Sequence, residues 1–226
     1  MSAGEDYRKL IRDRPELFAN LADGIRVETE PGTIAAIAAR VRRRYEAAGH
    51  PSGWAETGVV YVDPWIAVLR DAVTFPDGSV GLHSRVLCLG GEVSGVAICP
   101  RLGAKLVIIR QFRHATRRWH WEFPRGGRDG EPGEAAAARE IEEEIGARVT
   151  RIEPLGLVHG ATHVLANAVA LYLADIEAFG EPQRSEGIAE IRLMGGEELA
   201  GMIREGEITD AFTIAAFARA RLRGLL

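Results

Sequence analysis

Cysteine is almost absent from this sequence. Only Cys88 and Cys99 occur among the 226 residues, which is too few for a disulfide framework, and their spacing does not match a zinc site. The N-terminal segment has no apolar signal core, and no apolar run approaches the roughly 20 residues of a membrane-spanning helix. These absences argue against a disulfide-rich secreted scaffold and predict a cytoplasmic protein without a membrane partner.

An excess of positive charge is also missing. The chain carries 28 Lys and Arg against 32 Asp and Glu, which gives a net charge of −4. Proteins that bind duplex nucleic acid usually carry an excess of positive charge, and this chain does not, so a nucleic-acid polymer is not an expected partner. The hydrophobic content of 46% is enough for a real core, and the length suits one domain with an extension or two small domains.

The first 56 residues read as a helical N-terminal extension. From Thr33, apolar residues recur at helical spacing, whereas the basic residues occupy mostly other faces: Ile34, Ile37, Val41 and Tyr45 against Arg40, Arg42, Arg43 and Arg44. The basic cluster either contacts a phosphate or forms a solvated face. The solvated face is favoured, because charged outer faces are common.

From residue 57 on, the spacing of apolar residues changes from the helical period to the alternation that is typical of strands. Residues 57–91 contain short β-prone runs and predict a small antiparallel β unit. Residues 92–226 form the predicted main domain. Its expected strands cover 93–99, 105–111, 148–158 and 164–174, and its expected C-terminal helices begin at 197 and end near 217.

A glycine-rich loop and an alanine-rich helix that ends at Gly146 lie at the centre of this domain. Glu140, Glu143 and Glu144 fall on one side of the helix. Like charges three and four residues apart destabilise a helix by roughly 0.2–0.5 kcal/mol per pair, and acids near its C-terminus oppose the macrodipole. A bound Mg²⁺ would resolve the conflict; an ordinary solvated acidic face is the alternative.

This segment resembles the Nudix box, G-x5-E-x7-R-E-U-x-E-E-x-G-U, in which U is aliphatic. The residues in register are Glu131, Arg139, Glu140, Ile141, Glu143, Glu144 and Gly146. The sequence departs from the pattern at two points: only four residues separate Gly126 from Glu131, and Ala147 stands at the final aliphatic position.

The resemblance implies an α/β fold, a Nudix-type α/β/α sandwich with a mixed sheet, and a pyrophosphohydrolase that uses Mg²⁺ or, alternatively, Mn²⁺. It implies that Glu140 and Glu144 bind the metal directly, that Glu143 acts as a ligand or through water, and that the backbone at Gly126 helps to hold the ion. Arg139 would fix the carboxylates by charge-assisted hydrogen bonds, and Glu131 would support them from the loop.

The segments that flank the box resemble the ADP-ribose and ADP-sugar pyrophosphatase branch of the family. They are Arg110-Gln111-Phe112-Arg113, Glu122-Phe123-Pro124-Arg125-Gly126 and the tail pattern Gly-x-Ile-x-Asp-x-x-Thr from Gly206. Arg110, Arg113 and Arg125 are the expected phosphate ligands. Trp121 either contacts a base or packs in the core, and Glu122 either joins the metal site or forms a surface salt bridge.

The same branch implies a glutamate on a later loop that activates water, for which Glu186 is the first candidate and Glu190 the second. It also implies a homodimer and a small nucleotide substrate, with ADP-ribose or a related nucleotide sugar favoured. Thr162 replaces a proline common in the branch. Two alternatives therefore stay open: a catalytically weak binding or regulatory module, and a hydrolase of another phosphoanhydride such as a nucleoside triphosphate or a dinucleotide.

Overall fold

A computed structural model describes residues 3–226 of the chain. Contacts divide the chain into two compact units: an N-terminal unit of Met1–Leu89 with Ala161–Ala166, and a C-terminal unit of Gly90–Gly160 with Asn167–Leu226. The finer division of the sequence at residues 57 and 92 stays a prediction. None of the helices in the described part of the chain is both long enough and apolar enough to span a membrane.

The N-terminal unit combines helices with a small antiparallel sheet. Its elements are α1 (Ala3–Asp13), η1 (Pro15–Phe18), β1 (Arg26–Val27), α2 (Pro31–Ala47), η2 (Ser52–Ala55), β2 (Gly58–Val62), β3 (Ile66–Thr74) and β4 (Val80–Cys88). Strand β3 pairs with β4 and also with β2 and β1. The N-terminal extension is therefore not purely helical, because it contributes β1 to this sheet.

A buried charge network ties the first helix to the sheet. Asp71 of β3 is 3% exposed; its carboxylate accepts a hydrogen bond from the Tyr7 hydroxyl and lies 2.7 Å from Nε of Arg85. The Arg85 guanidinium in turn stands 5.0 Å from the ring centroid of Phe18. Because these groups are paired with one another, the charge of Asp71 is tolerated inside the unit.

The C-terminal unit is built on a mixed sheet. Its strands are β5 (Val93–Leu102), β6 (Lys105–Arg113), β7 (Arg118–Glu122), β8 (Arg125–Gly127), β9 (Val149–Val158), β10 (Ala168–Ile176) and β11 (Ile188–Met194). The order is β11-β6-β5-β10-β9, with β7 paired to β6 and β8 paired to β5. The β5–β10 pair is parallel, and the other pairs are antiparallel.

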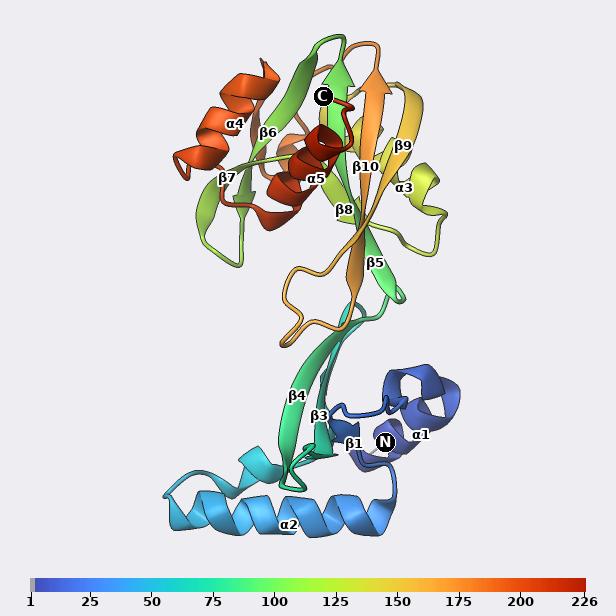
Figure 1. Ribbon diagram of the computed structural model, residues 1–226, viewed down its shortest axis with the longest axis vertical. Coiled ribbons are helices and arrows are strands. Elements are labelled where there is room, and N and C mark those ends of the chain that lie inside the picture. Colours follow the sequence, from blue (N-terminus) through green and yellow to red (C-terminus); the bar gives the residue numbers. More distant parts are fainter. Residues whose placement is uncertain (1–2) are drawn as a thin grey trace. The chain divides into compact units, whose positions relative to one another are not determined.

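Helices cover both faces of this sheet (Figure 1). Helix α3 (Gly133–Ile145) buries Ile141 and Ile145 against the face that carries Ile98 and Ile109. Helices α4 (Gly196–Arg204) and α5 (Ala211–Leu222) pack on the opposite face, where Phe217 joins the second apolar cluster. The predicted α/β sandwich with a mixed sheet is present in this unit.

The strand predicted over residues 164–174 begins later, at Ala168. Residues 161–166 belong to the N-terminal unit, where the N–H of Val86 donates to the carbonyl of Val164 at 2.7 Å and the N–H of Ala166 donates to Val86 at 3.0 Å. An apolar run by itself does not show where a chain leaves one sheet for another, because residues of both sheets are equally apolar.

Gly146 ends α3 in the left-handed conformation, with φ of 60°. We expect Gly146→Ala to lower the free energy of unfolding by roughly 1–2 kcal/mol, since a Cβ is disfavoured at this φ. Space is not the cause, because the added Cβ would meet its nearest neighbour at an ordinary 3.5 Å. Urea unfolding followed by circular dichroism measures the change.

Gly196→Ala is the matched control, because Gly196 opens α4 with a negative φ and an added Cβ there meets nothing within 4 Å. The control should leave stability equal or slightly raised. Equal losses in both variants would contradict the conformational explanation.

Candidate active site

Helix α3 carries its acidic residues at the border between core and solvent. Pro132 precedes the first turn, and the alanines that follow have high helix propensity. Glu140 and Glu144 are buried, at 8% and 3% exposure, on the same side as Ile141, whereas Glu143 is exposed. The acidic cluster is therefore not a solvated face, since two of its three carboxylates are held inside the fold.

The guanidinium group of Arg139 holds this cluster to the glycine-rich loop. It donates from Nη1 to Glu140 and Glu143, each at 2.9 Å, and from Nε to Glu131 at 3.1 Å. Its Nη2 donates to the carbonyl oxygen of Gly127 at 2.8 Å. All of these acceptors are oxygen atoms of the box segment, so Arg139 connects the loop to the acidic residues of the helix.

Gly126 lies directly against Glu140. A Cβ built at position 126 would stand 2.0 Å from the carboxyl carbon of Glu140, so any side chain there would displace the carboxylate. Strand β8 holds the glycine in place through its pairing with β5, in which Gly126 is opposite Val96. The absent side chain at 126 thus sets the position of one predicted metal ligand.

A second polar group adjoins Glu144. The backbone N–H of Arg125 donates to Oε2 of Glu144 at 3.2 Å. The neighbouring Glu122, at the end of β7, is 0% exposed; Arg113 donates a hydrogen bond to its carboxylate, and Nε of Arg125 lies 3.6 Å from it. Glu122 is therefore a buried, paired carboxylate and not a surface salt bridge.

Burial and repulsion raise the pKa of both buried acids of α3. The pKa of Glu144 is raised to about 8, first by burial and then by the charge of Glu140; Arg113 opposes the shift. Burial is also the main reason why the pKa of Glu140 is raised, although Arg139 acts in the opposite direction. Both groups would be stabilised as carboxylates by an added positive charge.

The oxygen atoms of this region fit a hard divalent cation. The charges of Glu140 and Glu122 both act on Glu144, and Oε2 of Glu122 is buried without a hydrogen-bond partner among residues 3–226. Within the same residues, no three His, Cys, Asp or Glu side chains converge as a metal site; arginines pair with Glu122 and Glu140. The carboxylate oxygens suit Mg²⁺ chemically.

A cavity of about 260 Å³ adjoins Glu122 and is lined by Arg113, His120, Arg125 and Asp210, among others. Asp210, which was not predicted as a site residue, lies 3.6 Å from Nη2 of Arg125. It also caps α5 by accepting a hydrogen bond from the N–H of Thr213 at 2.8 Å. The tail pattern Gly-x-Ile-x-Asp-x-x-Thr already contained Asp210 and Thr213, so it could have indicated both residues from the sequence.

Among the remaining predicted residues, Arg110, Trp121 and Glu190 lie on the other side of the sheet from α3. Arg110 is opposite Trp121 on β7 and opposite Glu190 on β11, on the sheet face that α3 does not cover. Arg192 lies 4.3 Å from the ring centroid of Trp121 and pairs with Glu190 at 3.1 Å. Glu186 is exposed in η3 (Arg184–Glu186), and its carbonyl oxygen accepts a hydrogen bond from Gln111 at 2.8 Å.

Comparison with known proteins agrees with this geometry. Residues 91–215, over half of the chain, match the NUDIX domain. The chain belongs to the Nudix family. The match covers the loop, α3 and both groups of carboxylates described above.

Two curated relatives extend this Nudix assignment. The ADP-ribose pyrophosphatase of Mycobacterium tuberculosis is 30% identical over 165 residues, which cover 70% of this chain and 75% of that protein. The GDP-mannose pyrophosphatase of Cronobacter sakazakii is 26% identical over 168 residues, covering 68% and 86%. The predicted enzyme class, a Nudix pyrophosphohydrolase, is therefore confirmed.

A solved structure supports the fold. The crystal structure of an ADP compounds hydrolase superposes with a TM-score of 0.63 at 17% identity, covering 76% of this chain and 95% of that one. This likeness confirms the predicted fold class.

The raised pKa of Glu144 predicts a pH dependence of stability in metal-free solution. The folded Nudix chain keeps this proton up to about pH 8, whereas the unfolded chain releases it near 4.5. The folded state binds more protons in this window, so stability should fall as pH rises through it, by on the order of a few kcal/mol. Urea unfolding in EDTA across this range measures the fall.

Glu144→Gln should remove most of that fall, because its amide stays neutral at every pH. Glu142→Gln, on the exposed side of the same helix, should retain it. A fall of equal size in both variants would show that Glu144 does not carry the effect.

Proposed function

We propose that this Nudix protein hydrolyses the pyrophosphate bond of a nucleoside diphosphate linked to another moiety, with ADP-ribose or a related nucleotide sugar as substrate and Mg²⁺ as cofactor. One observation carries the proposal: the buried carboxylate of Glu122 lines a cavity together with Arg113 and Arg125, and the backbone N–H of Arg125 donates to the buried carboxylate of Glu144. The relatives named ADP-ribose pyrophosphatase and GDP-mannose pyrophosphatase support the substrate class.

The buried carboxylates are the proposed metal ligands. Glu140 and Glu144 supply direct oxygen ligands, Glu143 acts as a ligand or through water, and the backbone of Gly126 lies close enough to Glu140 to share its site. When bound, Mg²⁺ supplies Lewis-acid stabilisation of the diphosphate charge and of the leaving phosphate. Manganese would serve the same oxygen ligands.

Arg113 and Arg125 are the proposed phosphate ligands. Both guanidinium groups flank Glu122, and Nε of each is buried without a hydrogen-bond partner among the described residues. Planar guanidinium groups bind phosphate oxygens bidentately. Glu122 keeps both arginines in place and is a further oxygen donor for the metal.

We propose the roles of four further residues from their surroundings. Glu186 is the proposed water-activating residue, because its carboxylate is exposed and has no ion-pair partner within the described residues. Glu190 pairs with Arg192 on the other sheet face, which makes it the second choice. Arg110, with its guanidinium 5.4 Å from the ring centroid of Trp119, and Trp121 form a separate surface that we propose for the base.

We also propose a cytoplasmic homodimer. Tyr61, Val62 and Trp65, in β2 and in the turn that follows it, are 52%, 57% and 74% exposed. Exposed apolar residues beside an edge strand favour pairing with another chain.

A hydrolysis panel tests the function. With Mg²⁺ present, ADP-ribose, GDP-mannose, NADH and a dinucleoside polyphosphate are each incubated with the protein, and released nucleotide is measured by chromatography. We expect turnover to be greatest for a nucleotide sugar and to need the divalent ion. Glu144→Gln should lower kcat by about 100-fold or more, because it removes a charged ligand of the metal.

Glu142→Gln is the matched control and should keep wild-type turnover, since Glu142 points to solvent from the same helix. Tight binding without turnover of any substrate would favour the alternative of a binding or regulatory module. Turnover of the dinucleoside polyphosphate alone would contradict the proposed substrate class and favour the dinucleotide alternative.

Millimolar Mg²⁺ should raise the melting temperature of the wild-type chain, because a cation that binds the folded state relieves the repulsion between Glu140 and Glu144. Glu140→Gln should show a smaller rise, and Glu142→Gln the full rise. A melting temperature that neither Mg²⁺ nor Mn²⁺ changes would contradict the metal site.

A further inference from the structure

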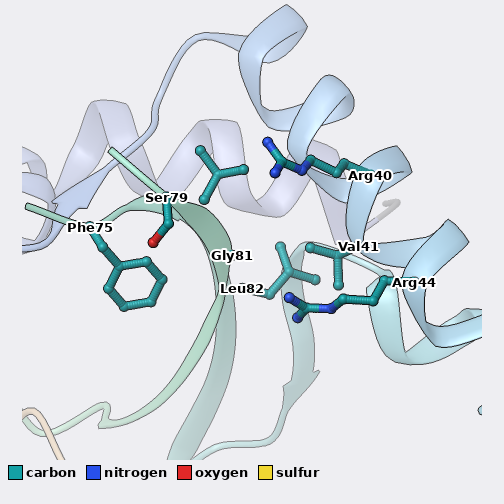
Figure 2. A pocket seen from close by; sticks show the side chains of 8 residues that line it. Arg40, Val41, Arg44, Phe75, Ser79, Gly81 and Leu82 are labelled. Atoms are coloured by element: carbon teal, nitrogen blue, oxygen red, sulfur yellow. The ribbon is translucent and has the colours of Figure 1, made fainter. Parts of the chain in front are cut away.

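The N-terminal unit contains a second cavity, of about 460 Å³, between α2 and the hairpin of β3 and β4. Small-molecule sites range over roughly 300–1,000 Å³, so this cavity is large enough for one. Figure 2 shows Arg40 and Arg44 extending from α2 toward the strand that carries Gly81 and Leu82. All lining residues belong to the N-terminal unit, and none takes part in the carboxylate site.

The charged side chains that line this cavity are positive. Arg40 and Arg44 lie four residues apart, on the same side of α2, and no acidic residue of the described part of the chain lines the cavity. Neither arginine forms an ion pair with a carboxylate of the described residues. Like charges at this spacing destabilise a helix, so an anion between the two guanidinium groups would relieve a repulsion.

The turn between β3 and β4, which contributes Ser79 to the cavity, also carries an acidic side chain. The carboxylate of Asp77 accepts a hydrogen bond from the backbone N–H of Ser79 at 2.9 Å. That contact fixes the carboxylate to its own turn, outside the residues that line the cavity.

The other side of the cavity is apolar. Phe75 and Leu82 line it together with Val41 and Val80, and Gly81 lets the Phe75 ring come close to the strand, since a Cβ at 81 would stand 3.1 Å from that ring. Two guanidinium groups beside an apolar wall match a ligand that joins a phosphate to a flat organic group. An inorganic anion would leave the wall uncovered.

We propose that this cavity, lined by Arg40, Arg44, Phe75 and Leu82, binds a nucleoside phosphate, with the phosphate between the two arginines and the base against the apolar wall. The proposal divides the basic cluster of α2 into two pairs. All four arginines are exposed, but only Arg40 and Arg44 line the cavity and bind the ligand; Arg42 and Arg43 do not line it. It does not depend on the hydrolytic function.

Amide NMR shifts of the full chain, titrated in EDTA, test the proposal with AMP, adenosine and inorganic phosphate as separate probes. We expect AMP to shift Ser79, Gly81 and Leu82 to saturation, and adenosine or phosphate to bind there at least about tenfold more weakly, since each lacks half of the contacts. The shifts of Gly126 and Gly127 report binding at the carboxylate site separately.

Arg40→Ala combined with Arg44→Ala should weaken AMP binding at Ser79 and Gly81 by at least about tenfold, whereas Arg42→Ala combined with Arg43→Ala should leave it unchanged. The spectra themselves show that both variants fold. The proposal is overturned if AMP leaves these amides unshifted, if adenosine or phosphate binds as tightly as AMP, or if both double variants lose binding equally.

Discussion

The contacts of one guanidinium group organise the catalytic half of this protein. Arg139 donates to the side chains of Glu131, Glu140 and Glu143 and to the carbonyl of Gly127, so it joins the loop before α3 to the last turns of the helix. Without such a partner, acids at the C-terminal end of a helix would be destabilising. Burial of Glu140 and Glu144 also disfavours their charged carboxylate forms, and a bound cation would offset this cost.

The C-terminal helix supports the same site from the other side. Asp210 caps α5 and stands near Arg125, while the hydroxyl of Thr213 accepts a hydrogen bond from the backbone N–H of Phe123 at 2.9 Å. Because Phe123 follows Glu122 directly, the packing of α5 fixes the end of β7 and the start of the loop. A tail that is distant in the sequence therefore determines where the buried carboxylate of Glu122 lies.

Sequence reasoning found helix α3 and the box residues, because each depends on local periodicity or on a fixed spacing, and the resemblance to the Nudix family implied the mixed sheet. It did not find β7 or β8, because strands of five and three residues are too short to show a clear period. It grouped Arg110 and Arg113 as similar phosphate ligands, yet residues three apart on a strand point to opposite faces. Only Arg113 adjoins Glu122.

The sequence by itself determined the family, the helix with its acidic residues and the left-handed stop at Gly146, since these follow from residue type and spacing. The tertiary structure alone decided that Glu122 and Glu144 are buried and that Asp210 reaches Arg125. It also separated Arg40 and Arg44, which line a cavity, from their neighbours on α2. The physical reason is that burial and pairing depend on which distant segments pack together, and a single strand or helix does not specify its partners.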